Sequence, residues 1–480
     1  MSVATAAPQW LSESALRRLG ERTRSALQEA RRHGGATTLI SVSERLDGRV
    51  DPSAVVIRSR RPGEQWFCLE QPDREGTALA ALGCVHELAA PAERRFEEVD
   101  RRWRELVSRA LADPPAGPPG SGLAAAGGFA FAADGGDSPT WQGFGAGSLI
   151  VPELSLARRA GDTWLTVNLM PEADDTIDGV LASVGRRLAE LVVEPLPLLD
   201  PAPTGDFRVH SPMPPSHYEE AVARAVERIR AGELEKIVLA REVQVTAPAA
   251  HDPGAVFGIL RAGFPSCFVY AVGRGQATFV GASPELLVRR DGQRASTVAL
   301  AGSTRRSADP AVDDHLGEAL VRSDKDRQEI EIVARRIARA LAPYSVWVTA
   351  PPEPVLVRVA NIQHLATPIR AQLARPVGAV ALAGALHPTP AVGAEPFAAG
   401  GHLIPALEGL DRGWYAGPVG WTDLTGDGEF CVALRCALLR GEAASCFAGC
   451  GIVVGSVPAS ELAETEVKLG VMLPLLSGRA

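Results

Sequence analysis

Hydrophobic and polar residues alternate over many short stretches of the chain, and this pattern predicts strands. Two longer strands are predicted over residues 429–440 and 444–454. Helical spacing of hydrophobic residues predicts four helices, near residues 10–34, 216–232, 323–342 and 460–476. Because strands follow one another without regular βαβ spacing, the pattern indicates an α+β protein with large antiparallel sheets rather than a doubly wound fold.

Glycine and proline mark the ends of several elements and one candidate boundary. The first helix is expected to end at Gly34-Gly35, and Ser216 and Gly232 are the predicted N-cap and stop of the second helix. The proline-rich stretch PLPLLDPAPTGD at 195–206 is the best candidate linker. We therefore divide the chain into a helical extension over residues 1–35 and two further regions over 36–205 and 206–480.

The overall charge excludes some classes of partner. The 480 residues are 46% hydrophobic and 22% charged, which is typical of a folded protein rather than a disordered one. The net charge of −8 disfavours a broad nucleic-acid surface, because duplex binding depends on an excess of cations. The net charge does not exclude a local cationic pocket that binds a small anion.

Nothing in the sequence predicts export or membrane insertion. No clean apolar run approaches the ~20 residues that a membrane span requires. The N-terminus lacks a basic start followed by an apolar stretch, so we expect a cytoplasmic protein. The seven cysteines contain no Cys-x-x-Cys pair, and we interpret them as buried reduced thiols rather than a zinc site or disulfide framework.

Acidic residues occur on helix faces that should be apolar. In the 323–342 helix, Asp326 falls in the middle of the hydrophobic stripe and Glu329 at its edge. In the last helix, Glu461, Glu464 and Lys468 share one side, although a surface pair four residues apart would also explain the last two. Buried carboxylates require protons or a cation. A Mg²⁺ ion held by Glu329 and Glu464 would satisfy both helices.

Three further charged residues lie beside predicted strands. Lys236 opens the apolar run IVLA, Arg435 closes the run CVAL, and Glu285 follows a Ser-Pro turn. Solvated side chains at strand or loop ends are the simpler interpretation of each. Spacing alone does not connect these residues to one another. The stretch DLTGDGEF at 423–430 is interpreted as a hairpin turn, because its carboxylates do not fit a calcium loop.

Nine ordered motifs reveal a family resemblance. The chain resembles the chorismate-utilising enzymes, and within them the isochorismate synthases of menaquinone and siderophore biosynthesis. The motifs cover about 206–480 densely, and GGFAFAADGG at 127–136 extends the likeness towards the N-terminus. The motifs are EKIVLAR, GASPELLVRRDG with ALAGSTRR, SDKDRQEIEIV, NIQHLATPI, ALHPTPAV, RGWYAGPVGWTDLTGDGEFCVALR, AGCGIV and ELAETEVK. The resemblance implies two stacked antiparallel sheets wrapped by helices, with the active site in a cleft of the 206–480 region.

The resemblance also assigns roles to individual residues. It implies Lys236 as the base that activates water and Glu285 as the acid that protonates the departing hydroxyl. Glu329 and Glu464 map to ligands of Mg²⁺, with Glu461 and Asp326 supporting through water. The residues that map to the substrate pocket are Gly302, Ser303, His364, Tyr415, Arg435, Gly449 and Lys468.

These roles imply an isomerisation of chorismate. Water adds at ring C2 and the C4 hydroxyl leaves, which needs a base and an acid. A free lysine is protonated at neutral pH, so Lys236 must be desolvated or near other cations to act as base. Relatives that use ammonia generally lack this lysine, which favours water as the nucleophile. We expect a monomeric isochorismate synthase that feeds menaquinone or siderophore biosynthesis.

The main alternative is a salicylate synthase, which also eliminates pyruvate. Salicylate synthases share the lysine but depart from the motif HPTPAV, which this chain retains at 387–392. A chorismate-binding protein without catalysis and an ammonia-dependent synthase subunit are weaker alternatives, because the implied catalytic residues are all present. The chain departs from the family pattern at Ala394 and Glu395, and at Ile330 where histidine is common.

Overall fold

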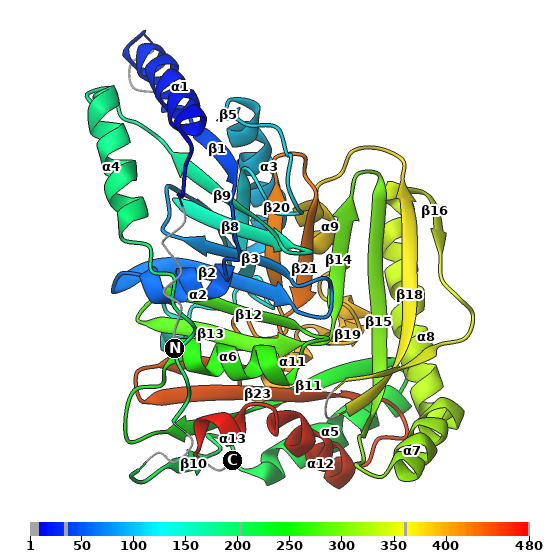
Figure 1. The fold of residues 1–480 in the computed structure, drawn as a ribbon. Helices are drawn as coiled ribbons and strands as arrows, with labels where there is room; N and C mark the ends of the chain where they lie inside the picture. The colour runs from blue at the N-terminus through cyan, green and yellow to red at the C-terminus, as the bar shows by residue number, and fades with distance from the viewer. Residues whose placement is uncertain (1–8, 33–36, 201–203, 360–361, 479–480) are drawn as a thin grey trace.

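The computed structural model describes residues 9–32, 37–200, 204–359 and 362–478. Within these residues the chain forms a 13-stranded sheet and a 10-stranded sheet, with helices around them (Figure 1). Neighbouring strands are antiparallel except β1 and β5. One hydrophobic cluster draws on both sheets, for example on Phe279 and Phe430. The predicted α+β class with two large antiparallel sheets is confirmed.

Each sheet combines strands that are far apart in the chain. In spatial order, the larger sheet contains β10 (Arg208–His210), β11 (Lys236–Thr246), β23 (Ala443–Ile452), β22 (Cys436–Arg440), β13 (Ala277–Ser283), β12 (Phe268–Gly275), β2 (Gly63–Gln71), β3 (Thr77–Leu82), β8 (Leu154–Arg159), β9 (Asp162–Leu169), β1 (Ile40–Arg45) and β5 (Leu111–Ala112), with β19 (Ala394–Glu395) beside β11. The smaller sheet contains β16 (Ser345–Thr349), β18 (Ile362–Leu373), β15 (Arg294–Arg305), β14 (Leu286–Asp291), β21 (Gly428–Val432), β20 (Pro418–Asp423), β6 (Ala124–Phe129), β7 (Gly147–Val151) and β4 (His86–Ala89), with β17 (Val355–Arg358) beside β18.

Along the chain, helices precede, separate and follow these strands. They are α1 (Glu13–Arg32), α2 (Pro52–Ser59), α3 (Arg95–Ser108), α4 (Ile177–Ala189), α5 (Pro215–Arg230), α6 (Pro253–Gly263), α7 (Pro310–Arg322), α8 (Asp324–Leu341), α9 (Ala379–Leu386), α10 (Phe397–Gly400), α11 (Leu403–Glu408), α12 (Pro458–Leu469) and α13 (Leu473–Leu476). Short 3-10 helices cover Ala92–Arg94, Pro139–Trp141 and Ala342–Tyr344.

Strands from both sides of the 195–206 stretch share the two sheets. In the larger sheet β2 pairs with β12, and in the smaller sheet β6 pairs with β20. The regions 36–205 and 206–480 therefore build the same two sheets together. The hairpin interpreted from DLTGDGEF is confirmed, because β20 and β21 pair across that turn.

The single strand predicted over 429–440 is wrong. The chain forms β21 in the smaller sheet, turns at Ala433–Arg435, and continues as β22 in the larger sheet. Arg435 has a φ of 50°, in the left-handed region that redirects a backbone. Residues 429–440 are mostly hydrophobic on both sides of this turn, so the pattern does not reveal where the chain passes from one sheet to the other. The pattern therefore predicts one strand.

A second crossing between the sheets lies beside the first. Strand β13 belongs to the larger sheet and β14 to the smaller one, and Pro284 and Glu285 connect them. The Val432 N–H donates to the Glu285 carbonyl at 3.0 Å, and the Ala282 N–H donates to the Arg435 carbonyl at 3.1 Å. These hydrogen bonds hold Glu285 and Arg435 side by side where the chain passes between the sheets.

Two predicted helix boundaries differ from the structure. Helix α5 begins at Pro215 with Pro214 as N-cap, earlier than the Ser216 cap predicted, because proline fits the first helical position well. The last predicted helix is interrupted after Leu469 and resumes as the short α13. Helix α8 agrees with prediction, and the Ser323 hydroxyl caps it by accepting the Asp326 N–H at 3.3 Å.

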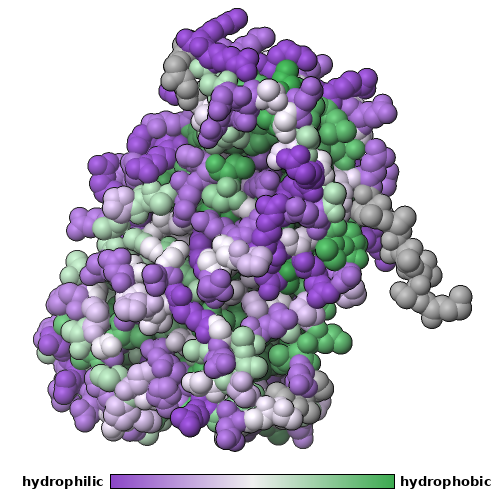
Figure 2. Space-filling view, turned by 90° about the vertical axis from the view of Figure 1, so that its left-hand side faces the viewer, coloured by the Kyte–Doolittle hydropathy of each residue, from purple (hydrophilic) through white to green (hydrophobic). Residues whose placement is uncertain are grey.

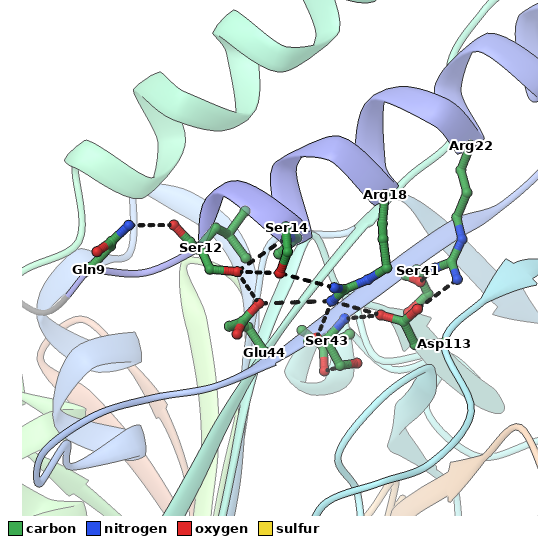
Figure 3. Close-up of polar contacts among 12 residues, drawn as sticks. Gln9, Ser12, Ser14, Arg18, Arg22, Ser41, Ser43, Glu44 and Asp113 are labelled. Carbon is green, nitrogen blue, oxygen red and sulfur yellow. Dashed lines mark hydrogen bonds and ion pairs between the residues drawn. The ribbon is translucent and has the colours of Figure 1, made fainter.

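Helix α1 is attached to the edge of the larger sheet. Leu19 and Ala26 are buried, and Arg22 donates to the Ser41 carbonyl and to Asp113, both at 2.6 Å (Figure 3). The other carboxylate oxygen of Asp113 accepts the Ser43 N–H at 2.9 Å. The helix is therefore packed on β1 rather than standing alone, while the stop predicted at Gly34-Gly35 lies outside the described residues. Hydrophilic residues dominate the surface around it, with smaller hydrophobic areas between them (Figure 2).

The cysteines and the helices can also be compared with the expectations from sequence. All seven cysteines are free thiols, as predicted, but the expected burial is wrong for Cys84, which is exposed. No helix in the described parts of the chain combines the length and the apolar composition needed to cross a membrane.

Candidate active site

A pocket opens where the two sheets meet helices α8 and α12. Strands of the larger sheet contribute Gly449, and strands of the smaller sheet contribute Gly302 and His364. The predicted site residues that line this pocket are Glu285, Gly302, Ser303, Glu329, His364, Tyr415, Arg435, Gly449, Glu464 and Lys468. Lys236, Asp326 and Glu461 do not line it, and lie behind residues that do. The structure thus brings residues from motifs spread over the whole 206–480 region around one cavity.

Lys236 lies directly behind the pocket wall. It is the first residue of β11, where it pairs in register with Glu395 of β19. Its side chain is buried, with only 1% exposed, and is therefore desolvated as the role implied for it requires. The ammonium Nζ lies 2.8 Å from Oε1 of Glu329, which lines the pocket. Within this structure the lysine and the carboxylate balance each other's charge.

Gly451, which is not among the residues predicted from sequence, makes room for this ion pair. A Cβ atom at this position would lie 2.3 Å from Oε1 of Glu329 and 2.8 Å from Cε of Lys236. No side chain larger than hydrogen fits there without displacing one of them. A glycine inside a predicted strand is a signal of close approach by another group, and this signal was present in AGCGIV.

Substitution of Gly451 by alanine is expected to lower kcat about 10²-fold, because a shift of about 1 Å in a reacting group has an effect of this size. Gly455→Ala is the matched control, since nothing lies within 4 Å of a Cβ at that position. Steady-state kinetics of both variants tests the prediction. Equal activity of the two variants would show that the Lys236–Glu329 pair tolerates displacement.

Glu285 is a buried carboxyl group with a raised pKa. Its side chain is only 5% exposed, at the crossing between β13 and β14. Burial raises the pKa of Glu285 to about 7, against the opposing influence of Lys236, Arg435 and Lys468. A carboxyl group with this pKa is protonated in a substantial fraction of molecules near neutral pH. It can therefore donate a proton, which an ordinary glutamate cannot do.

His364 is held neutral with one ring nitrogen available. Burial, together with the charges of Arg435 and Lys468, lowers the pKa of His364 to about 3. Nδ1 lies 3.1 Å from the Gly302 carbonyl, which can only accept, so Nδ1 carries the proton. Nε2 is buried without a hydrogen-bond partner among the described residues, and as an acceptor it can bind a hydroxyl group.

Gly302 adopts a backbone conformation that favours glycine. Its φ is +66°, and the pairing of β15 with β18 shifts register at this point. A Cβ there would also lie 2.8 Å from Oδ1 of Asp326, so a larger residue would meet the carboxylate. The bulge directs the Gly302 carbonyl to His364 and places Ser303 beside α12.

The pocket holds two cations that suit an anionic ligand. Lys468 donates to the Gly449 carbonyl at 2.8 Å and forms an ion pair with Glu464 at 2.7 Å. Arg435 forms no ion pair with any carboxylate among the described residues, so its guanidinium is available to an anion. The Tyr415 ring stacks on Phe447 with centroids 5.3 Å apart, and the two rings form an apolar wall.

Lysine is confined to this site. Only three of the 49 lysine and arginine residues are lysines, and each pairs with a carboxylate at or behind the pocket wall. Nζ of Lys325, a residue with no role predicted from sequence, lies 2.9 Å from Oε1 of Glu461. Cations elsewhere in the chain are arginines, so the rarity of lysine was a usable signal. A compact ammonium group and a planar guanidinium are not interchangeable.

The acidic residues around the pocket influence one another's pKa values. Burial raises the pKa of Asp326, and the nearby carboxylates Glu329 and Glu464 raise it further. Burial also acts to raise the pKa of Glu464, but Lys468 and the Ser303 hydroxyl, which donates at 2.7 Å, outweigh it and lower that pKa to about 2. Glu464 is therefore a permanent anion at neutral pH.

This donor set fits a hard divalent cation. Glu329 and Glu464 present carboxylate oxygens to one pocket, and such oxygens are the preferred ligands of Mg²⁺. Glu461, Glu464 and Cys450 place possible ligand atoms within 4.8 Å of one another, and Glu329 is not part of that group. The thiol of Cys450 is buried and its pKa is raised by burial, so it is a poor ligand for such an ion.

Comparison with known proteins identifies the family. A family model described as "Chorismate binding enzyme" matches residues 25–477. The chain is 39% identical over 411 residues to the salicylate biosynthesis isochorismate synthase of Pseudomonas aeruginosa, covering 85% of this chain and 84% of that protein. It is 32% identical over 450 residues to the isochorismate synthase MenF of Bacillus subtilis, covering 92% and 94%. The solved structure of the menaquinone-specific isochorismate synthase MenF from Escherichia coli matches with a TM-score of 0.75 and 26% identity, covering 95% of this chain and 99% of that one. This chain belongs to the family of chorismate-binding enzymes.

Proposed function

We propose that the protein is an isochorismate synthase, which converts chorismate reversibly to isochorismate. The observation that supports this most is a buried lysine, Lys236, directly behind the wall of the pocket that Glu285 lines, where burial raises the pKa of Glu285 to about 7. Addition of water and loss of hydroxide require a base and an acid of this kind. The identity of the relatives supports the same activity.

Chorismate is a dianion, so the pocket must supply positive charge to bind it. Arg435 and Lys468 provide two cations at the pocket wall, although the whole protein is acidic. The guanidinium of Arg435 can grip a carboxylate with two parallel hydrogen bonds. His364 Nε2 can accept a hydrogen bond from the ring hydroxyl. These contacts would orient the ring between the base and the acid.

The proposed reaction moves two protons. Lys236, once it is a neutral amine, takes a proton from water as the water oxygen bonds to ring C2, and the ring double bonds shift. Glu285 gives its proton to the hydroxyl at C4, and the C4–O bond breaks to release water. The ring gains and loses one water, so the overall change is an isomerisation. The reverse reaction uses the same two residues with their roles exchanged.

The acidic cluster would complete the site with Mg²⁺. Glu329 and Glu464 would bind the ion directly, and Glu461 and Asp326 would support it through water. When bound, Mg²⁺ supplies positive charge that stabilises a substrate carboxylate. Glu329 is at present the counter-ion of Lys236. A carboxylate of Glu329 engaged by a cation would balance the lysine charge less, which favours the neutral amine.

Incubation of the purified protein with chorismate and Mg²⁺, followed by chromatography, tests the proposed function. We expect isochorismate to form, and chorismate to form when isochorismate is supplied. Accumulation of salicylate with an equal amount of pyruvate would instead identify a salicylate synthase. Unchanged chorismate would refute both. We propose that the product supplies menaquinone or siderophore biosynthesis, and the names of the relatives point to salicylate and menaquinone as products of such pathways.

Removal of Mg²⁺ with EDTA is expected to abolish turnover, and added Mg²⁺ should restore it. Binding of Mg²⁺ can be measured without turnover from its effect on the free energy of unfolding. A ligand present at 100 times its Kd stabilises a protein by about 2.7 kcal/mol. Thermal unfolding should show this stabilisation in the wild type and much less in Glu329→Gln. Glu331→Gln, an exposed position on the same helix, is the control. Equal stabilisation of all three proteins by Mg²⁺ would exclude Glu329 as a ligand.

A further inference from the structure

A buried ion pair lies behind the pocket and has no role in the proposed reaction. The side chains of Arg412 and Glu408 are 3% and 1% exposed. Nε of Arg412 donates to Oε2 of Glu408 at 3.0 Å, and Nη2 donates to Oε1 at 2.5 Å. The ring of Phe131 covers the guanidinium, with its centroid 4.2 Å from Cζ. Neither charged residue lines the pocket.

The pair forms hydrogen bonds with the backbone of two segments that contribute to the pocket wall. Arg412 donates to the Val392 carbonyl at 2.7 Å and to the Val238 carbonyl at 3.0 Å. Glu408 accepts the Ala240 N–H at 2.7 Å. Val238 and Val392 both line the pocket. One ion pair therefore fixes strand β11 at two points and joins it to the loop before β19.

These attachments lie close to Lys236 along the chain. Val238 is two residues after Lys236 on β11, so both side chains point to the same side of the sheet. The Val238 N–H donates to the Gly393 carbonyl at 2.7 Å, and Lys236 pairs with Glu395. A change in the position of the 392–395 segment relative to β11 would therefore move the start of the strand, where Lys236 lies.

Stability alone is a poor explanation for such a pair. Burial of two charges costs free energy, and replacement of a buried pair by apolar residues is often neutral or stabilising. The planar guanidinium has five donors in a fixed arrangement, so it defines the relative position of the groups that it binds. Apolar side chains of similar volume would fill the space without defining these positions.

We propose that Arg412 and Glu408 are positioning residues, which hold β11 and the 392–395 segment in the arrangement that places Lys236 at the pocket. This inference rests on the proposed function, because it assigns the pair to the step in which Lys236 accepts a proton from water. The pair acts on catalysis through Lys236 and does not contact the substrate.

Removal of the charges in two ways separates positioning from folding. In Arg412→Met the buried Glu408 loses its partner, so both thermal stability and activity should fall. In the double variant Glu408→Leu/Arg412→Met no buried charge is left unpaired, and the unfolding midpoint should return towards that of the wild type. We expect kcat of the double variant to stay about 10²-fold lower, with KM for chorismate nearly unchanged.

Two further variants separate the effect of the arginine geometry from the effects of charge and of lost stability. Arg412→Lys retains the charge but loses the fixed geometry, so it should fold and still show a lowered kcat. Arg187→Met removes another buried arginine, which pairs with Glu64 away from the pocket, and should lose stability without a change in kcat. A double variant or an Arg412→Lys variant with wild-type kcat would overturn the proposal. A wild-type protein that forms no isochorismate would refute the proposed function instead.

Discussion

Substitution of Lys236 by methionine is expected to lower kcat for isochorismate formation by about 10²- to 10⁴-fold, which is the usual contribution of a general base. Methionine fills a similar volume in the fully buried position but cannot accept a proton. Chorismate binding should be retained, because the cations Arg435 and Lys468 remain at the pocket wall. Steady-state kinetics together with equilibrium binding of chorismate distinguishes loss of chemistry from loss of binding.

Arg335→Met is the matched control for this substitution. Arg335 of α8 forms an exposed ion pair at 2.7 Å with Glu235, the residue before Lys236. The Lys236–Glu329 pair joins the same two segments in the interior. Loss of the exposed pair should leave kcat unchanged. A Lys236→Met variant as active as Arg335→Met would remove Lys236 from the mechanism.

Substitution of Glu285 by glutamine is expected to lower kcat by a similar factor, about 10²- to 10⁴-fold, because an amide cannot protonate the leaving hydroxyl. Glutamine keeps the shape of the side chain and is uncharged, as the protonated acid is. The fold should therefore be preserved. Kinetics of the variant, with its unfolding midpoint as a check on structure, measures the effect.

The pH dependence of the wild type tests the same residue independently. Burial raises the pKa of Glu285 to about 7, and the acid is active only when protonated. In the direction from chorismate to isochorismate, kcat/KM should therefore fall as pH rises through about 7. Glu285→Gln has no group that titrates at this position, so this fall should be absent from its profile. Persistence of the fall in the variant would assign it to another group.

Local patterns in the sequence predicted the elements that carry the site. The stripe of Ile330, Val333 and Ile337 marked the buried face of α8, and these residues are indeed buried. Lys236 begins β11 as the run IVLA indicated. These features follow from the periodicity of one element, so they can be recognised in one short segment. The periodicity placed Asp326 in the middle of the buried stripe and Glu329 at its edge. This prediction is wrong, because Glu329 is buried and Asp326 only partly buried.

Features that depend on distant segments could not be predicted in this way. The chain changes sheet at Glu285 and at Arg435, and only the packing of two sheets reveals that these crossings lie side by side. The pairing of Lys325 with Glu461 joins residues that are 136 positions apart. The contact of Arg412 with Val238 spans 174 positions. No periodicity within a single element reports on such contacts.

The central claim is that water, activated at Lys236, becomes the new ring hydroxyl at C2. The most direct test is to run the reaction in water enriched in oxygen-18 and to analyse the isochorismate by mass spectrometry. We predict that isochorismate formed by the wild type carries one oxygen-18 atom, located at the C2 hydroxyl. Isochorismate without the heavy isotope would show that the hydroxyl moves within the substrate, and would contradict the assignment of Lys236 as the base that activates water.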